Sequence, residues 1–355
     1  MTMSNFFYLV ATDQKKGFLV GIVKAALWVL SLIFRALLLL RKVIYQVRIM
    51  PSYRLPKAVI SIGNLTVGGT GKTPLIAYIA GQLMNKGAKP VILTRGYMGR
   101  GGGTKDYESD EAAMLRRALP DVPILVGSDR VKNAKNFIKD HAVDVILMDD
   151  GFQHWRLKRD LDIVTIDAAN PWGNGCLLPL GILREPKSAL VRADLFILTR
   201  ADQGKERLSE IKNEIHKHNA RAPIIEAVHR PVCFRDVRSG TAYDLHIIQE
   251  KSVYAVSSIG APDAFIKTLT GLGARVKEHH DFCDHHHYIR GDIRKIAKSC
   301  VDGDIASIVT TEKDAVKIKR LIGEMPERLR VLSLNIKIGI IHGEDRLVER
   351  IHSVL

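Results

Sequence analysis

A glycine-rich segment between an apolar stretch and a helix-type pattern constrains the fold of this chain more than any other feature. Residues 57–78 read KAVISIGNLTVGGTGKTPLIAY. The apolar residues Ala58, Val59, Ile60 and Ile62 predict a short strand, and apolar residues recur at helical spacing after Pro74. A strand, a glycine loop ending in Gly-Lys-Thr and a helix together form the context of a phosphate-binding loop. The sequence therefore predicts phosphate or nucleotide binding at this point.

The chemistry of this loop follows from its residue types. Glycines allow the backbone N–H groups to turn toward phosphate oxygens at the positive end of the helix dipole. Lys72 is placed to reach the β- and γ-phosphates, and the Thr73 hydroxyl to take one coordination position on Mg²⁺. The candidate nucleotide-binding residues are Thr66, Val67, Gly68, Gly69, Thr70, Gly71, Lys72 and Thr73.

The loop departs from the commonest pattern, GxxxxGK[ST], because Thr66 stands where that pattern has its first glycine. Its GGTGKT core is closer to the variant loop of the MinD/ParA-type ATPases, although Val67 replaces the lysine that those proteins carry before the double glycine. A membrane-associated ATPase switch of that type is therefore an alternative function. A GTPase is a second alternative, because residues 199–202 (TRAD) loosely match the [NT]KxD motif that reads guanine.

Bulk composition limits the classes of partner. The chain of 355 residues is long enough for two domains, and its 46% hydrophobic and 26% charged residues predict a folded protein. A net charge of +15 indicates an acidic partner such as anionic lipid or a phosphorylated substrate. Aromatic residues make up only 6% and do not alternate with basic ones, so we expect no nucleic-acid partner. The four scattered cysteines predict reduced thiols and argue against a zinc site.

The segment 18–40 is almost continuously apolar and long enough to span a bilayer. It carries Lys24, Ser31 and Arg35, which fall with Lys42 along one side of a helix. Such a helix can lie in the membrane interface, where its basic residues contact anionic headgroups. We therefore expect a membrane-seated helix with anionic lipids as partners, and interfacial docking ahead of spanning. A core helix of a soluble domain is the alternative, and a cleaved signal peptide is disfavoured by the length of the apolar region.

A further strand-type segment, residues 143–148, ends in the adjacent acids Asp149 and Asp150. An apolar strand that closes on two acids downstream of a phosphate loop is the Walker B arrangement. One carboxylate holds Mg²⁺ directly or through water, and its neighbour can orient a nucleophile. The alternative is a pair of solvated loop acids.

Two polar segments leave their interpretation open. Asp110 follows a glycine-rich, basic loop and precedes a helical pattern, so helix capping and catalysis are equally good interpretations. The histidine-rich stretch 279–288 (HHDFCDHHHY) suggests a metal site, but adjacent histidines seldom converge on one ion. A single histidine there could serve as a base or base partner, and a polar, partly buried loop is the alternative.

Strand-type and helix-type segments alternate along the chain, which predicts an α/β fold. We expect a mostly parallel sheet of the P-loop NTPase type with helices on both faces. The expected divisions are a hydrophobic, basic membrane-associated helix at 1–50, a P-loop core domain at 51–226, a connecting segment at 227–250 and a smaller α/β domain at 251–355.

Taken together, the motifs resemble those of the tetraacyldisaccharide 4′-kinases, the lipid A 4′-kinase family of Gram-negative bacteria. The motifs, in the family's order, are GNLTVGGTGKTP (63–74), TRGYMG (94–99), MDDGFQH (148–154), PLGILREP (179–186), DFCDHHHY (281–288) and TEKDAVK (311–317). Thr66 agrees with the family's own form of the loop. The resemblance implies transfer of the γ-phosphate of ATP to the 4′-hydroxyl of tetraacyldisaccharide 1-phosphate, giving lipid IVA. It also implies a location at the cytoplasmic face of the bacterial inner membrane.

The resemblance further implies roles for single residues. The family's catalytic dyad, an Asp in a loop that usually reads GDEP and a His of the DHH motif, falls on Asp110 and His285. In this chain the loop reads SDEA at 109–112. Asp150 is the third catalytic candidate, and Thr73, Asp149 and Glu185 are the candidate ligands of Mg²⁺.

The remaining implied contacts concern substrate and cofactors. ATP and Mg²⁺ are the implied cofactors, and an acylated glucosamine disaccharide 1-phosphate is the implied substrate of what we expect to be a monomer. Candidate substrate contacts are Arg95, Arg130, Arg184 and His154.

Overall fold

The computed structural model describes residues 10, 11, 13, 17–96, 110–283 and 286–355 of the chain. Two compact units divide the chain. The first comprises Met1–Gly99, Ala118–Val228 and Ile338–Leu355, and the second comprises Arg100–Arg117 and His229–Lys337. The chain passes from one unit to the other within two long strands, β7 (Ile224–Asp236) and β12 (Arg330–His342).

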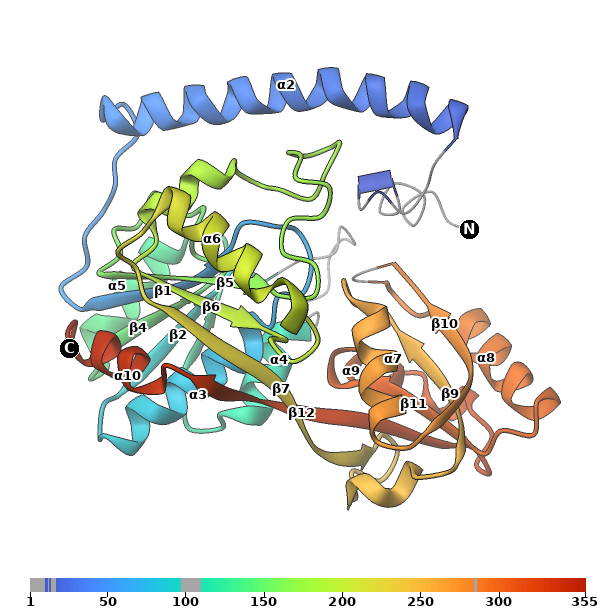
Figure 1. Ribbon diagram of the computed structural model, residues 1–355. Coiled ribbons are helices and arrows are strands. Elements are labelled where there is room, and N and C mark those ends of the chain that lie inside the picture. Colours follow the sequence, from blue (N-terminus) through green and yellow to red (C-terminus); the bar gives the residue numbers. More distant parts are fainter. Residues whose placement is uncertain (1–9, 12, 14–16, 97–109, 284–285) are drawn as a thin grey trace. The chain divides into compact units, whose positions relative to one another are not determined.

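The first unit is built on a parallel sheet with the strand order β7-β6-β5-β1-β4-β2-β3 (Figure 1). Its other strands are β1 (Ala58–Asn64), β2 (Pro90–Thr94), β3 (Ile124–Val126), β4 (Val145–Asp149), β5 (Leu161–Asp167) and β6 (Leu195–Thr199). Its helices after the N-terminal one are α3 (Lys72–Asn85), α5 (Arg130–Asp140), η1 (Lys187–Arg192), η2 (Lys205–Arg207), α6 (Leu208–His218) and α10 (Glu344–His352).

The strands of this sheet are apolar on both faces because helices cover both. Every residue of β2, β4, β5 and β6 is buried. One hydrophobic cluster packs α5 against β2 and β4, and another packs α6 against β5 and β6. Burial on both faces is the reason that these segments read as short apolar runs rather than as alternating patterns.

The second unit is a smaller parallel sheet with the order β10-β9-β11-β12. Its strands are β9 (Ser252–Ser257), β10 (Arg275–Asp281), β11 (Ser307–Thr311) and part of β12, and the short β8 (Ala242–Tyr243) pairs antiparallel with β7. Its helices are α7 (Pro262–Gly271), α8 (Arg290–Asp302), α9 (Glu312–Lys319), η3 (Leu245–Ile248) and η4 (Ile322–Glu324). α4 (Asp110–Ala118) belongs to it except for its last residue. These features confirm the expected fold class, a mostly parallel α/β sheet with a second, smaller α/β unit.

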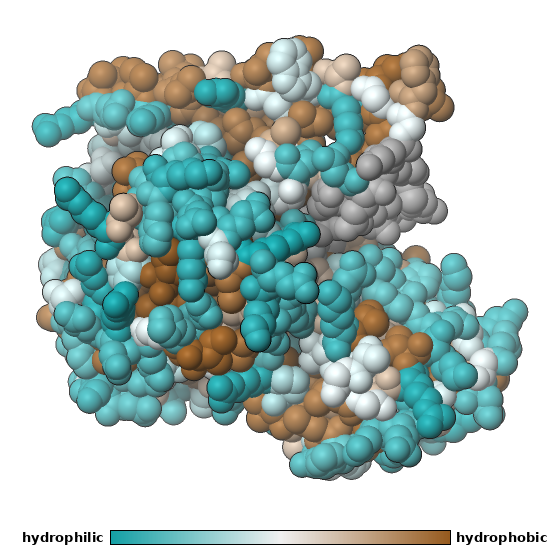
Figure 2. Space-filling model, viewed as in Figure 1, coloured by the Kyte–Doolittle hydropathy of each residue, from teal (hydrophilic) through white to brown (hydrophobic). Residues whose placement is uncertain are grey.

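The N-terminal helix α2 (Phe18–Gln46) lies along the first unit (Figure 1). Most of its large apolar side chains are exposed, and they form an apolar band on the surface (Figure 2). Its few buried residues include Leu27, which packs near Leu180, and Ser31. The Ser31 hydroxyl donates to the Leu177 carbonyl at 3.0 Å and accepts the Leu180 N–H at 3.2 Å. The side of the helix that carries Ser31 therefore faces the unit.

The composition of α2 fits a membrane environment. Among the described residues it is the one helix long and apolar enough to cross a membrane, with a mean hydropathy of 2.1 over its most apolar window. Only 6% of that window is buried within the protein. Arg35 and Lys42 are exposed alongside the apolar side chains, whereas Lys24 is partly covered and pairs with Asp13.

Candidate active site

The glycine loop joins the carboxyl end of β1 to the start of α3 in the first unit. Gly68 and Gly71 adopt φ angles of 108° and 78°, which glycine reaches without strain. Gly71 is the residue before α3, so the loop ends at a helix N-terminus with outward N–H groups. A Cβ atom added to Gly69 would meet no atom within 4 Å. The loop therefore has the backbone shape and the open space that a chain of phosphates needs.

Buried threonines from neighbouring strands brace this loop. The hydroxyls of Thr70 in the loop and Thr165 on β5 are 2.7 Å apart, and both side chains are buried. Thr199, at the end of β6, donates its hydroxyl to the Thr70 carbonyl at 3.0 Å. The loop is thus held in shape by the sheet beneath it.

Arg200 explains the sequence that loosely matched a guanine-reading motif. Its side chain is 7% exposed, and its guanidinium group forms an ion pair with Asp167 at the end of β5 and donates to the Gly69 carbonyl at 3.0 Å. Arg200, the basic residue of TRAD, therefore supports the backbone of the phosphate loop. The described contacts give it no part in reading a base.

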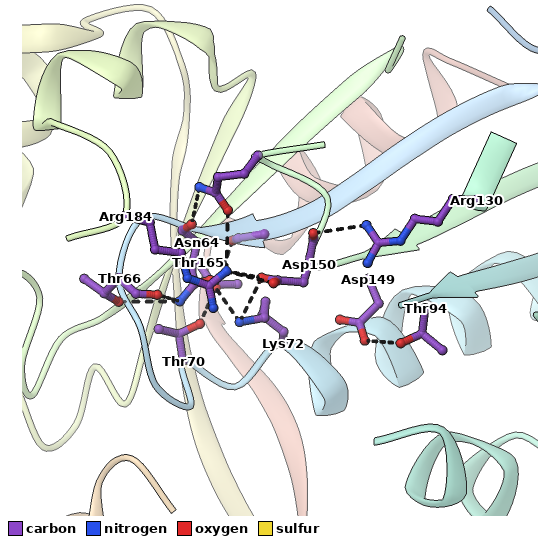
Figure 3. A network of polar contacts seen from close by, with 12 residues as sticks. Asn64, Thr66, Thr70, Lys72, Thr94, Arg130, Asp149, Asp150, Thr165 and Arg184 are labelled. Carbon is purple, nitrogen blue, oxygen red and sulfur yellow. Dashed lines mark hydrogen bonds and ion pairs between the residues drawn. The ribbon is translucent and has the colours of Figure 1, made fainter. Parts of the chain in front are cut away.

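Lys72 lies at the centre of a polar network beside the loop (Figure 3). Its ammonium group donates to Asn64 Oδ1 at 2.9 Å and lies 3.3 Å from Asp150 Oδ1. Arg184 contacts the same carboxylate, with Nη1 at 2.7 Å from Asp150 Oδ2. Burial opposes ionisation of Asp150, but the charges of Lys72 and Arg184 outweigh it and hold the pKa of that carboxyl well below its usual range. Two cations and one carboxylate therefore stand together at the loop.

Asp149, the other acid of the pair, is buried at the end of β4. Thr94 on β2 donates its hydroxyl to Asp149 Oδ2 at 3.2 Å. Burial raises the pKa of Asp149 above its ordinary value, against the opposing charge of Lys72. A bound cation would reverse that shift by favouring the ionised carboxylate.

The donor set suits Mg²⁺ better than a metal held by protein alone. No group of three or more His, Cys, Asp or Glu side chains within the described ranges could hold a metal ion. Mg²⁺ commonly takes one or two carboxylates and fills its other positions with waters and phosphate oxygens. Asp149 and the Thr73 hydroxyl at the start of α3 supply hard oxygens of this kind.

The loop 179–186 is joined directly to the phosphate loop. The Arg184 N–H donates to the Leu65 carbonyl at 2.7 Å, and the Val67 N–H donates to the Ile182 carbonyl at 2.8 Å. Glu185, the third metal candidate, is buried and paired through both oxygens with Arg192, at 2.7 and 3.0 Å. Its use as a metal ligand would require that pair to open.

The other candidate substrate contacts differ in environment. Arg130 is buried and donates to the Asp150 carbonyl at 3.2 Å, whereas Arg95 is exposed. His154 is half-buried, and burial together with Arg130 and Arg159 lowers its pKa to about 4. Its Nε2 atom has no hydrogen-bond partner among the described residues. His154 is therefore neutral at pH 7.

Of the two expected members of the catalytic dyad, the structure describes Asp110 but not His285. Asp110 is the first residue of α4, and its Oδ2 atom lies 3.2 Å from the ammonium group of Lys317 on α9. His285 lies outside the described residues, as does most of the glycine-rich loop before Asp110. The neighbouring His286 pairs through Nε2 with Asp292 at 2.8 Å.

Asn64, Arg192 and Lys317 are among the residues of these networks that had no individual role in the sequence-based interpretation. Asn64 and Lys317 fall within recognised motifs, GNLT and TEKDAVK, so motif membership was the available signal. Arg192 had no comparable signal, because only the folded chain brings it to Glu185.

Comparison with known proteins gives consistent matches over most of the chain. Residues 23–355 match the family model described as tetraacyldisaccharide-1-P 4′-kinase. A tetraacyldisaccharide 4′-kinase of Syntrophus aciditrophicus is 38% identical over 310 residues, which cover 82% of this chain and 83% of that protein. The protein of the same name from Anaeromyxobacter sp. strain K is 36% identical over 356 residues, and the match covers 96% of this chain and 93% of that protein.

A solved structure also matches. LpxK from Aquifex aeolicus, crystallised in complex with ATP, aligns with a TM-score of 0.70 at 28% identity. The match covers 94% of this chain and 99% of that one.

Proposed function

This chain belongs to the tetraacyldisaccharide-1-P 4′-kinase family, and from that premise we propose that it transfers the γ-phosphate of ATP to the 4′-hydroxyl of a tetraacyldisaccharide 1-phosphate. The product is the 1,4′-bisphosphate. The observation that carries the proposal is the phosphate loop with Lys72, Asp150 and Arg184 gathered beside it.

Binding of the triphosphate follows from the loop. Its N–H groups and the α3 N-terminus attract phosphate oxygens, and Lys72 exchanges its contact with Asp150 for the β- and γ-phosphates. When bound, Mg²⁺ neutralises charge on the phosphates. Thr73 and Asp149 are the residues proposed to hold it, with Glu185 joining only if Arg192 releases it.

The transfer itself asks the protein mainly for positioning and charge neutralisation. A bond forms between the 4′-oxygen and the γ-phosphorus while the bond from that phosphorus to the β–γ bridging oxygen breaks, and ADP leaves. Asp110, supported by His285, is proposed to accept the hydroxyl proton. Asp150 is proposed to keep Lys72 and Arg184 in place until the phosphates arrive.

The acceptor is a lipid, so we also propose that α2 docks in the interface of the cytoplasmic face of the inner membrane. Leu37 and Leu40 are 57% and 55% exposed, and Arg35 and Lys42 are exposed beside them. Apolar side chains and basic groups on one helix suit the acyl region and the anionic headgroups of a bilayer surface.

Co-sedimentation with vesicles tests this docking. We expect wild type to sediment with vesicles containing anionic lipid, and Leu37→Glu combined with Leu40→Glu to remain largely in the supernatant. Val191→Glu is the matched control, because Val191 is 65% exposed on the same unit but outside α2. Equal sedimentation of the double variant would contradict docking through α2. Resistance of the wild type to extraction by high salt and alkaline carbonate would favour spanning instead.

Transfer of labelled γ-phosphate in detergent micelles tests the activity. With ATP and tetraacyldisaccharide 1-phosphate, labelled lipid should form in proportion to ADP. Rapid ATP hydrolysis without labelled lipid would overturn the kinase and leave the membrane-associated ATPase switch as the function. Competition by GTP as strong as by ATP would point to the GTPase alternative.

A further inference from the structure

We propose that Lys317, a buried lysine of α9, is a positioning residue for Asp110. The proposal rests on the role given above to Asp110 as acceptor of the substrate proton. All the residues that carry it lie in the second unit.

The contacts of Lys317 place its charge between two acids. The side chain is 8% exposed, and its ammonium group lies 3.2 Å from Asp110 Oδ2 and 3.7 Å from Asp314 Oδ1. It also donates to Ser258 Oγ at 3.1 Å. A buried ammonium group is stable only when such partners compensate for its lost hydration.

Asp314 has other donors and does not depend on Lys317. It is fully buried and accepts hydrogen bonds from the Ser258 N–H at 2.8 Å, the Ser258 hydroxyl and the Thr311 hydroxyl at 2.7 Å. Its own N–H donates to Thr311 Oγ1, which caps α9. Asp314 therefore fixes Ser258 and the start of α9, and the shorter ion pair of Lys317 is directed to Asp110.

The geometry at Asp110 suits a proton acceptor. Its Oδ2 atom is held by the buried ammonium group, and the side chain keeps 21% of its surface exposed. Oδ1 makes no hydrogen bond to the part of the chain that the structure describes. One oxygen is thus anchored, and the other is available to a substrate hydroxyl.

The division of the chain into units supports the same conclusion. Residues 110–117 of α4 group with the second unit, although Ala118 and the chain that follows it to Val228 belong to the first. Lys317 provides an ion pair that attaches the first residue of this helix to α9. Asp110 is therefore held by a long-range contact and not by its sequence neighbours alone.

A double-mutant cycle tests whether Lys317 acts through Asp110. Phosphate transfer to tetraacyldisaccharide 1-phosphate is measured for wild type, Lys317→Met, Asp110→Ala and the double variant. We expect Lys317→Met to lower kcat by about 100-fold with the KM for ATP changed by less than about twofold. In the Asp110→Ala background the same substitution should cause no further loss, since the group that it positions is already absent.

Two control variants separate positioning from general effects on α9. Lys319→Met removes the same charge from an exposed position on the same helix and should leave kcat unchanged. Thr311→Ala removes the cap of α9 and should lower the melting temperature by about 4 °C without a comparable loss of kcat. Should Lys317→Met not fold, Lys317→Arg replaces it, because the charge is kept while the shape of the donor changes.

The outcomes distinguish a failure of the role given to Lys317 from a failure of the proposed kinase function. Full activity of Lys317→Met beside an inactive Asp110→Ala would overturn the role of Lys317 and leave the proposed function intact. A further loss in the Asp110→Ala background would also overturn it, because the role would then be structural. Full activity of Asp110→Ala would instead remove Asp110 as the base, and the role of Lys317 with it.

Discussion

The two units each contain a cluster of opposite charges, and the clusters differ in how deeply their side chains are buried. In the first unit the side chains of Lys72, Asp150 and Arg184 remain 14%, 28% and 22% exposed. In the second, Lys317 and Asp314 are 8% and 0% exposed, and Asp110 at the edge of the cluster is 21% exposed. The first cluster stands beside an open glycine loop, whereas the second surrounds α9, which packs Ala315 and Ile318 into a hydrophobic core.

The difference in burial predicts a difference in use. Partly solvated ion pairs contribute little to stability, so a phosphate chain can replace one partner at small energetic cost. Removing one partner of a buried ion pair strongly destabilises the folded protein, because the other charge stays buried without compensation. Such a pair therefore keeps its geometry through a reaction cycle. We therefore interpret the first cluster as one that exchanges partners with ligand and the second as one that keeps them.

The largest effect is expected at Lys72. Lys72→Met should lower kcat/KM for ATP by about 1,000-fold, because the lysine is proposed to neutralise phosphate charge that grows during transfer. Thermal unfolding should change little, since its ion pair is partly solvated. Lys86→Met, at the exposed position directly after α3, is the control. A large loss of stability in Lys72→Met would show that this ion pair also stabilises the fold, which would contradict the difference drawn between the two clusters.

Arg192 belongs to a half-buried pair within the first unit, in which its own side chain is 29% exposed and that of Glu185 is buried. Arg192→Met should reduce the free energy of unfolding by about 3 kcal/mol, because Glu185 is 6% exposed and would keep an unpaired charge. Chemical denaturation measures the change. In the double variant with Glu185→Gln most of the loss should be recovered, and no recovery would show that Arg192 acts through its packing instead.

The threonine bracing of the loop should have a smaller effect. Thr199→Val leaves the buried Thr70 carbonyl without this donor, which should destabilise the protein by about 1 kcal/mol and raise the KM for ATP about fivefold. Thr310→Val is a matched control in the second unit, because its buried hydroxyl has no partner among the described residues. Equal effects of the two substitutions would contradict a bracing role for Thr199.

The smallest effect concerns pH. His154 has its pKa lowered to about 4 in the folded protein, so between pH 6.5 and 4 the unfolded chain binds more protons at this residue. Stability should therefore fall as pH falls through that window, by about 1 kcal/mol after allowance for partial solvent exposure. His154→Gln should remove this part of the slope, and His246→Gln, at a side chain 83% exposed, should not. An unchanged slope in His154→Gln would exclude this residue as its source.

Local patterns predicted the parts of the fold that depend on neighbouring residues. The strand, glycine loop and helix at 57–78 and the apolar strand before Asp149 carry their signals within a few residues. Asp150 and Arg184 were each singled out, but the ion pair between them joins two loops and could not be inferred from either motif. The pairs Glu185–Arg192 and Asp110–Lys317 depend in the same way on folded geometry.

Periodicity on α2 shows a related limit. The spacing of Lys24, Ser31, Arg35 and Lys42 indicated a polar side of the helix, but periodicity does not say what that side faces. In the structure Ser31 faces the first unit, while Arg35 and Lys42 remain exposed. Chain order likewise could not show that Ile338–Leu355 joins the first unit, because β12 returns the chain to it.

The central claim is that the first cluster exchanges partners with ligand and the second keeps its partners. Calorimetric titration tests it most directly: ATP with Mg²⁺ is titrated into wild type, Lys72→Met and Lys317→Met. We predict that Lys72→Met loses at least about 100-fold in ATP affinity, because the first cluster supplies the phosphate contacts. Lys317→Met should bind ATP like wild type while failing to transfer phosphate at the normal rate. An equal loss of ATP affinity in both variants would contradict the division of roles between the two clusters.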